Sequence, residues 1–252
     1  PYGYGWTALS LVPVVAGMGK FLLTYMFMKV WIVVGFVLLW FAMKRLARVL
    51  GMQKEYESSK WLFFLNPLVL IETFSNAHND VWMMAPVVLA CSLVLMKSKK
   101  GQQWLMWVVA LALLTISASI KFATLALIPV LCVLIVKQFV KKNMFIDLLA
   151  KYWPEFASVV LFLPLLTSRS QQFHPWYLIW SLTFLPFIQT KWMRWFFIAF
   201  SISSLARYLP YILIGDYTQV VLRQELMITW VGGMGVFVVG ILMKHLHPRM
   251  LE

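Results

Sequence analysis

Long apolar stretches recur along almost the whole chain and are separated by short basic clusters. Hydrophobic residues make up 62% of the 252 residues and charged residues only 12%, whereas soluble domains average about 45–50% and about 25%. A soluble fold of this length cannot cover so much apolar surface, so we expect lipid to surround most of it. Because unpaired backbone groups are not tolerated in hydrocarbon and no strand alternation of the barrel kind is visible, the spanning elements should be helices.

The predicted fold is therefore all-α, a polytopic transmembrane helical bundle that forms one integral membrane domain over residues 1–252. About nine hydrophobic segments are expected, several of them short or broken. They cover residues 21–46, 61–74, 81–96, 104–117, 123–136, 156–166, 175–187, 195–214 and 227–243. Because the chain begins with Pro1 rather than Met and shows no signal peptide, we expect further N-terminal helices and a first extracytoplasmic loop upstream.

The 22 Lys and Arg residues predict the orientation of these segments. A net charge of +13 would suit nucleic acid, but the basic residues lie between apolar runs rather than on one soluble face, so no nucleic-acid partner is expected. Basic clusters end every second segment, and the positive-inside rule assigns these ends to the cytoplasm. The sequence thus predicts a multi-pass plasma-membrane protein whose connections near Asp80, Arg169 and Asp216 are extracytoplasmic.

Several predicted segments are too short for a full crossing. As a helix, the segment over residues 61–74 would be about 21 Å long, against an apolar core of about 30 Å. The outer tips of such segments should lie below the membrane surface, where irregular backbone is tolerated only when it is buried in protein or lines a wet cavity. We therefore expect the tips at Asn76, Lys121 and Arg169 to converge on one outward-facing polar cavity.

The first polar motif, Ser-Asn-Ala-His-Asn-Asp, follows the segment that contains Asn66-Pro67. Ionisable residues at membrane depth are costly, and by default they mark a substrate or ion pathway. Asn76, Asn79 and Asp80 can bind sugar hydroxyls, while His78 can donate to a phosphate or transfer a proton near neutral pH. The alternative is an interfacial turn whose Asn and Asp side chains cap the next helix.

The second motif, Gln-Gln-Phe-His-Pro-Trp-Tyr, lies at another predicted outer tip. Trp176 and Tyr177 can be ordinary interfacial anchors or can stack on sugar rings, and His174 beside them favours a site. Lys121 and Arg169 lie on the outer side against the charge bias, which an anionic partner such as a lipid phosphate would explain. Lys121 can instead extend to the membrane interface.

At these motifs the chain resembles the GT-C class of polyprenol-phosphate-sugar-dependent glycosyltransferases, especially bacterial mannosyltransferases. The matching stretches are PYGYGWT at residues 1–7, NP at 66–67 with NAHND at 76–80, and HPWYL at 174–178. The resemblance implies a GT-C-like fold and transfer of a hexose, expected to be mannose, from a polyprenyl-phosphate donor to a glycan or lipid-linked acceptor of the cell envelope. It also implies a catalytic carboxylate in the first extracytoplasmic loop, which would precede Pro1.

The function hypothesis is an inverting glycosyl transfer on the extracytoplasmic side. Lys121, Arg169 and His174 would face the phosphate, and Asn76, His78, Asn79 and Asp80 would face the sugar or acceptor, with Asp80 and His78 assisting the upstream carboxylate. No metal-ligand set is predicted, because the two cysteines lie inside apolar runs, although a divalent ion at the leaving phosphate is left open. A transporter or flippase of a lipid-linked saccharide, or a polysaccharide polymerase or ligase, remains an alternative.

Overall fold

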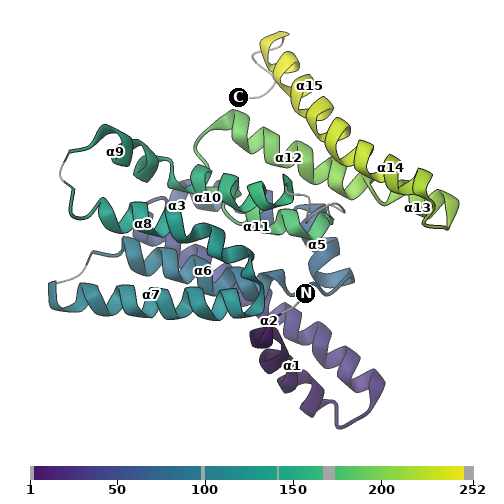
Figure 1. The fold of residues 1–252 in the computed structure, drawn as a ribbon, viewed down its shortest axis with the longest axis horizontal. Coiled ribbons are helices and arrows are strands. Elements are labelled where there is room, and N and C mark those ends of the chain that lie inside the picture. Colours follow the sequence, from purple (N-terminus) through teal and green to yellow (C-terminus); the bar gives the residue numbers. More distant parts are fainter. Residues whose placement is uncertain (1–2, 98–99, 141, 167–173, 247–252) are drawn as a thin grey trace.

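The computed structural model describes residues 3–97, 100–140, 142–166 and 174–246, and each regular element in these ranges is a helix (Figure 1). The elements are α1 (Tyr4–Ala16), α2 (Phe21–Leu50), α3 (Gln53–Ser59), α4 (Trp61–Phe64), α5 (Pro67–Leu70), η1 (Ile71–Ser75), α6 (Asp80–Leu95), α7 (Lys100–Ile120), η2 (Phe122–Leu127), α8 (Ile128–Val136), α9 (Met144–Lys151), α10 (Trp153–Phe162), η3 (Leu163–Leu166), η5 (Pro175–Tyr177), α11 (Leu178–Leu182), η6 (Leu185–Phe187), α12 (Lys191–Ala206), α13 (Leu209–Ile214), α14 (Gln219–Met227), η7 (Ile228–Gly232) and α15 (Gly233–Leu246). The predicted all-α class is thereby confirmed for the described part of the chain.

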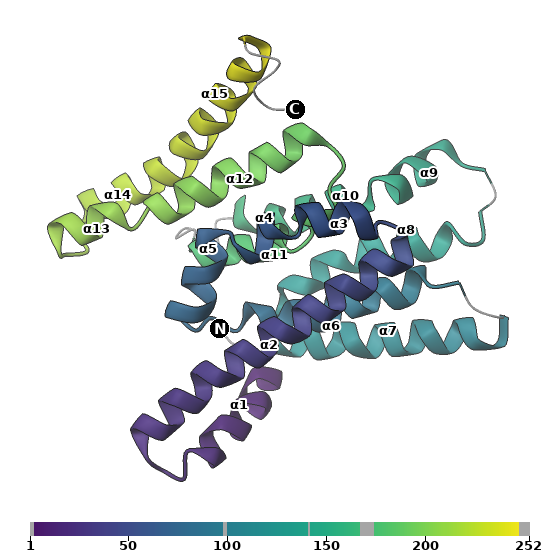
Figure 2. The ribbon, with the colours of Figure 1, turned by 180° about the vertical axis from the view of Figure 1, so that it is seen from behind.

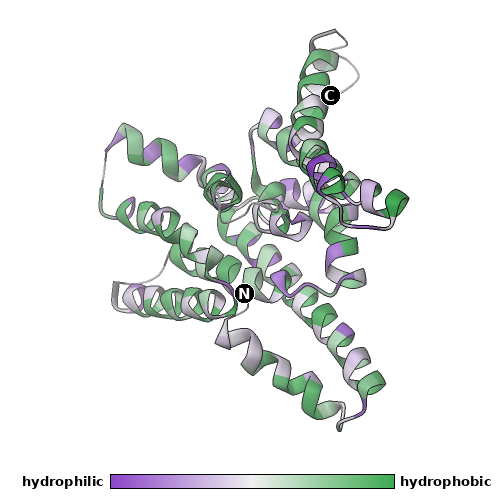
Figure 3. Ribbon diagram, turned by 45° about the vertical axis from the view of Figure 1, so that its right-hand side comes forward, coloured by the Kyte–Doolittle hydropathy of each residue, from purple (hydrophilic) through white to green (hydrophobic). Residues whose placement is uncertain are grey.

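Four described helical stretches are long and apolar enough to cross a membrane: Phe21–Leu50, Gly101–Ile120, Lys191–Ile214 and Gln219–Met243. Two bent helix pairs raise the number to six if each pair is one span, so the predicted count of nine segments is not confirmed. Large hydrophobic side chains point outward along α2, with Phe21 85% and Leu22 62% exposed. Hydrophobic residues run along nearly every helix (Figure 3). Exposed apolar surfaces of this extent are typical of a membrane protein, in which lipid covers them.

Helix α6 is the centre of the bundle and packs between α2 and α7 (Figure 1, Figure 2). The indole of Trp82 on α6 stacks on Trp31 of α2 with ring centroids 4.5 Å apart and donates to the Trp31 carbonyl oxygen at 2.8 Å. Gly35 allows this contact, because a Cβ there would lie 2.6 Å from the Trp82 ring. Helix α6 is apolar and buried around most of its circumference, as expected for a central helix.

The glycines of the N-terminal motif permit a close approach of α1 to the end of α7. The amide of Gly3 donates to the Ile120 carbonyl oxygen at 2.9 Å. A Cβ at Gly5 would lie 2.0 Å from Ser119 Oγ, and one at Gly3 would lie 2.1 Å from the Ser119 carbonyl oxygen. Only glycine fits at either position, and the contact fixes the end of α7 directly before Lys121.

The segment predicted over residues 61–74 is not a single helix. It forms α4, α5 and the π-helix η1, and the chain then bends by 118° into α6. The break follows from Asn66-Pro67: proline starts a new helix readily, and Asn66 caps it by accepting from the Leu68 amide at 3.0 Å. Ala77 completes the bend in the left-handed region, with φ of 56°, a conformation that costs about 1–2 kcal/mol outside glycine.

The segment predicted over residues 175–187 also differs from a lipid-facing span. It forms the short elements η5, α11 and η6, and most of its side chains are buried in protein. Pro175 is the first residue of one short 3-10 helix and Pro186 the second residue of another, and these elements interrupt the α-helical run. The apolar character of this stretch therefore reflects the protein core, a distinction that hydropathy alone does not make.

Candidate active site at the start of helix α6

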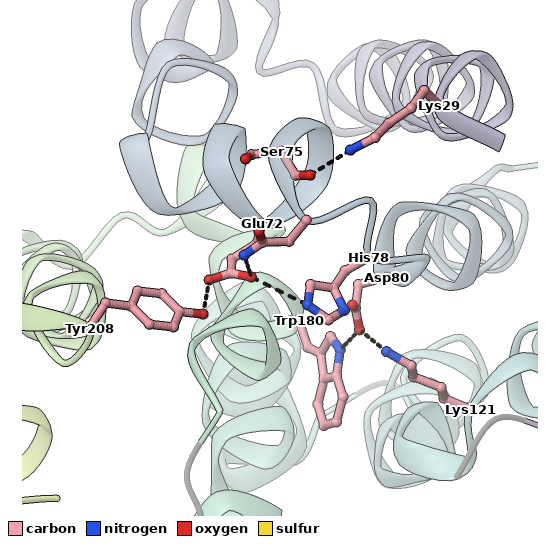
Figure 4. Close-up of polar contacts among 9 residues, drawn as sticks. Lys29, Glu72, Ser75, His78, Asp80, Lys121, Trp180 and Tyr208 are labelled. Atoms are coloured by element: carbon pink, nitrogen blue, oxygen red, sulfur yellow. Dashed lines mark hydrogen bonds and ion pairs between the residues drawn. The ribbon is translucent and has the colours of Figure 1, made fainter. Parts of the chain in front are cut away.

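The bend between η1 and α6 brings two carboxylates into the interior (Figure 4). Glu72 on η1 and Asp80 at the start of α6 both have an exposed fraction of 0%. A buried carboxylate is stable only when it is paired and hydrogen-bonded. The partners of these two groups therefore define the site.

Asp80 joins three parts of the chain. Its Oδ1 accepts from the ammonium of Lys121, which precedes η2, at 2.7 Å, and from the indole N–H of Trp180 on α11. The other oxygen, Oδ2, is buried with no hydrogen-bond partner among the described residues. The position of Asp80 in the first turn of α6 also suits the positive end of the helix dipole.

Glu72 is held from both sides. Its Oε1 accepts from the hydroxyl of Tyr208 at 2.6 Å, and its Oε2 accepts from the Asn76 amide at 2.9 Å. The same Oε2 lies 3.4 Å from Nε2 of His78. Neither Glu72 nor Tyr208 is among the site residues expected from the sequence. Glu72 was visible as an acidic residue in an apolar run, whereas nothing local marks Tyr208, which is 136 residues away.

The aromatic residues of the second motif pack on the first. The ring of Trp176 stacks on His78 with centroids 4.0 Å apart and on His174 with centroids 4.3 Å apart. The ring of Tyr177 contacts that of His174 edge-on with centroids 5.6 Å apart, and its centroid lies 4.8 Å from that of Trp180. One aromatic cluster thus connects both predicted motifs to the indole that binds Asp80.

The helix-cap alternative explains little of this arrangement. Asn79 occupies the N-cap position of α6, but its side chain makes no capping hydrogen bond. Both its amide oxygen and its amide nitrogen are buried without a hydrogen-bond partner among the described residues. Asn76 points to Glu72 rather than to a helix end. The side chains of Asn76 and Asp80 therefore serve contacts other than capping, and that of Asn79 caps no helix.

Three cationic side chains from different parts of the chain lie around the site. Lys29 on α2 donates to the carbonyl oxygens of Phe74 at 2.9 Å and Ser75, at the C-terminal end of η1 (Figure 4), where a helix favours positive charge. Arg207 forms a buried ion pair with Glu225 at 3.1 Å. Lys121 is 9% exposed and points to Asp80, so it does not extend to the membrane interface.

Burial lowers the pKa of His174, and the guanidinium of Arg207 lowers it further. His174 lies between the candidate spans. At a pH above its ordinary titration range the imidazole is neutral, and this neutral ring packs on Trp176. Among the described residues, no group of three or more His, Cys, Asp or Glu side chains is arranged to hold a metal ion.

The structure brings together most of the site residues that the sequence predicted. The members of this cluster are Asn76, His78, Asn79, Asp80, Lys121, His174, Trp176 and Tyr177. Arg169 lies outside the described residues, as do Gln171 to Phe173 of the second motif. The shared outward-facing cavity and the carboxylate upstream of Pro1 stay predictions.

The family of the chain follows from a comparison with known proteins. The model of a family described as alpha-(1->6)-mannopyranosyltransferase, N-terminal domain, matches residues 1–137. No curated protein and no solved structure matches the chain. The match covers more than half of the sequence and includes Glu72, Asp80 and Lys121, while His174 and Tyr208 come from the remainder. The chain therefore belongs to the alpha-(1->6)-mannopyranosyltransferase family.

Proposed function

We propose that the chain transfers a mannosyl residue from a polyprenyl-phosphate donor to a hydroxyl of a glycan or lipid-linked acceptor on the extracytoplasmic side of the plasma membrane. The name of the family favours an α-(1→6) linkage. The observation that carries the proposal is the buried Asp80–Lys121 ion pair, which lies beside an aromatic cluster of two imidazoles and an indole in a member of this family. Ionisable groups at membrane depth are by default functional.

The proposed reaction places definite demands on the site. The bond between the anomeric carbon and the phosphate oxygen breaks, a bond from that carbon to the acceptor oxygen forms, and the acceptor proton passes to a base. Inversion follows when the acceptor attacks the face opposite the leaving phosphate. Such a site needs a carboxylate or imidazole for the proton and fixed cations or donors for the charge that develops on phosphate.

The donor phosphate is proposed to bind near Lys121, His174 and Arg169. Lys121 is held by Asp80 at 2.7 Å, so the ammonium has a fixed position before any substrate arrives. Such preorganisation matters because a fixed charge needs no rearrangement as the reaction proceeds. Asp80 thus acts on the phosphate through Lys121, in addition to any assistance that it gives to the upstream carboxylate.

The sugar or acceptor is proposed to meet the first motif and the aromatic cluster. The amide of Asn79 offers a donor and an acceptor with no partner among the described residues, which is the pair that a hydroxyl requires. His78 precedes it directly and Asn76 lies three residues earlier, and Trp176 and Tyr177 supply the rings that stack on pyranose faces.

The proposal is tested in proteoliposomes with labelled polyprenyl-phosphate-mannose and a mannan oligosaccharide acceptor. Asp80→Asn and Lys121→Met are each expected to reduce transfer on the order of a hundredfold, because misplacing a reacting group by about 1 Å has that effect. Glu155→Gln is the matched control: Glu155 is also buried, but it accepts from the backbone amides of Gln189 and Thr190 instead.

Two results would overturn the proposal. One is that both site variants transfer mannose at the rate of the Glu155→Gln control. The other is that the wild-type protein moves an intact lipid-linked saccharide across the membrane without forming a glycosidic bond, which would identify a flippase. Donor supplied on one side of sealed vesicles with known protein orientation tests the proposed extracytoplasmic side.

A further inference from the structure

Glu72 is a fully buried acidic residue whose two oxygens both have partners. Tyr208 binds Oε1, while Asn76 and His78 contact Oε2. Glu72 is 0% exposed and both its oxygens already contact protein side chains, so it is not placed to react with a substrate itself. Among the described residues, His78 is the basic side chain within ion-pair distance of Glu72. The role of Glu72 therefore lies in its effect on His78.

His78 is tied to Glu72 twice. The backbone amide of His78 donates to the Glu72 carbonyl oxygen at 3.0 Å, while the imidazole Nε2 lies 3.4 Å from Glu72 Oε2. The left-handed backbone at Ala77 makes both contacts possible within one turn. The face of the imidazole packs on Trp176 at 4.0 Å. A carboxylate at the edge and an indole on the face together fix the orientation of the ring.

Resting on the proposed function, we infer that Glu72 and Tyr208 are positioning residues that hold the imidazole of His78 with Nε2 protonated toward Glu72 and Nδ1 presented to a substrate hydroxyl. In a neutral imidazole one nitrogen donates and the other accepts. A carboxylate beside one nitrogen fixes its proton there and selects the tautomer, as carboxylates do for catalytic and metal-binding histidines. Nδ1 then accepts a hydrogen bond from the reacting or neighbouring hydroxyl.

Tyr208 extends this support beyond the matched family domain. It precedes α13 and reaches η1 from the far end of α12, so its hydrogen bond joins the two parts of the chain at the site, as does that of Trp180 to Asp80 (Figure 4). The other charged or titratable groups around His78 are Asp80 and Lys121, then His174 on the same indole, Lys29 behind η1, and Arg207 next to Tyr208. Tyr208, like the amide of Asn76, is a neutral donor to Glu72, so its hydroxyl orients the carboxylate without cancelling its charge.

The tautomer of His78 can be measured without any assay of activity. The chain has four histidines, and histidine-selective ¹⁵N labelling of the protein in nanodiscs distinguishes protonated from unprotonated ring nitrogens. The His78 resonances are assigned by their loss in His78→Gln. We expect Nε2 to be protonated and Nδ1 unprotonated in the wild type, and a mixture of both tautomers in Glu72→Gln. Tyr208→Phe should give a smaller change of the same kind.

Transfer kinetics provide the second measurement. Glu72→Gln is expected to lower kcat for mannosyl transfer on the order of a hundredfold, while KM for the sugar donor stays within about twofold. The reason is that Glu72 orients a reacting group and does not itself contact the sugar donor. Glu72→Asp keeps the charge on a shorter side chain and should restore part of the rate. It also keeps the inference testable if Glu72→Gln does not fold.

The chain offers a matched control for each substitution. Glu155→Gln removes another buried carboxylate, and Tyr56→Phe removes the hydroxyl of a buried tyrosine that stacks on Phe187. Both should retain the wild-type His78 spectrum and rate. An unprotonated Nε2 in the wild type, or an unchanged spectrum in Glu72→Gln, would overturn the inference. The expected spectra without mannosyl transfer by the wild type would instead overturn the proposed function alone.

Discussion

Asp80 and Lys121 form an ion pair with an N–O distance of 2.7 Å although 41 residues separate them in the chain. Helix α7 lies between them in sequence, and its length sets where Lys121 returns to the start of α6. Because Asp80 is fully buried and Lys121 nearly so, the pair compensates two charges that are largely removed from solvent. The pair therefore contributes to both the stability of the bundle and the electrostatics of the site.

Removing either partner of this pair should cost more while the other partner is still present. Asp80→Asn or Lys121→Met alone should lower the free energy of unfolding by about 3–5 kcal/mol, because each removes the ion-pair partner of a buried charge. The double variant should be less destabilised than the sum of the two. Unfolding in mixed micelles is measured for the wild type, the two single variants and the double variant. Strictly additive effects on the free energy of unfolding would contradict a direct interaction.

The close contact between α1 and α7 makes a second prediction. In Gly5→Ala the new Cβ would lie 2.0 Å from Ser119 Oγ and 2.9 Å from the Ser119 carbonyl carbon. The helices must separate, which should lower the free energy of unfolding by about 1–3 kcal/mol.

Gly240→Ala is the control for that substitution. Gly240 lies within α15 with open space around it, so alanine there should be neutral or should stabilise the helix by about 0.5–1 kcal/mol. Thermal unfolding of both variants in the same detergent gives the comparison. Equal stability of the two variants would show that α1 does not pack on α7 as described.

The sequence predicted which polar residues lie together better than it predicted the span count. The convergence of His78, Asp80, Lys121 and His174 could be expected because apolar runs fix where the polar tips lie, and short runs bring tips to a common depth. The breaks were harder to predict. Asn66-Pro67 is a helix-start signal in sequence, but the 118° bend also needs the π-helix η1, which depends on tertiary contacts.

Glu72 and its partner illustrate what sequence could not reveal. Glu72 lies in an apolar run, so it could equally face a cavity, a partner or the membrane interface. Its orientation is set by η1, and Tyr208 comes from a part of the chain with no recognisable motif. Likewise, the core position of residues 178–182 cannot be read from hydropathy, because buried and lipid-facing helices are equally apolar.

His174 predicts a pH dependence of stability. Burial and then Arg207 lower its pKa below the ordinary value of 6.5. Above that value the imidazole is neutral in both the folded and the unfolded chain. As the pH falls below it, the unfolded chain takes up a proton first, so the free energy of unfolding should decrease. Melting temperatures between about pH 7.5 and about pH 5 should fall more steeply for the wild type than for His174→Gln.

Membrane orientation provides the last prediction. The basic clusters place Lys97 and Lys142 in the cytoplasm and Asp216 outside. Helix α9, which begins two residues after Lys142, and the α13–α14 connection lie on opposite sides of the structure in Figure 1, as this orientation requires. All three positions are exposed, so they suit single-cysteine labelling. The background carries Cys91→Ala and Cys132→Ala, which remove the two native thiols.

In intact cells an impermeant maleimide should label Asp216→Cys alone, and after permeabilisation it should label all three variants. The permeabilised samples are the control for accessibility, and the cysteine-free background is the control for specificity. Labelling of Lys97→Cys or Lys142→Cys in intact cells would reverse the orientation. The positively charged ends would then face outward, and the Asp80–Lys121 pair would lie toward the cytoplasm, where it could not serve a donor presented on the extracytoplasmic side.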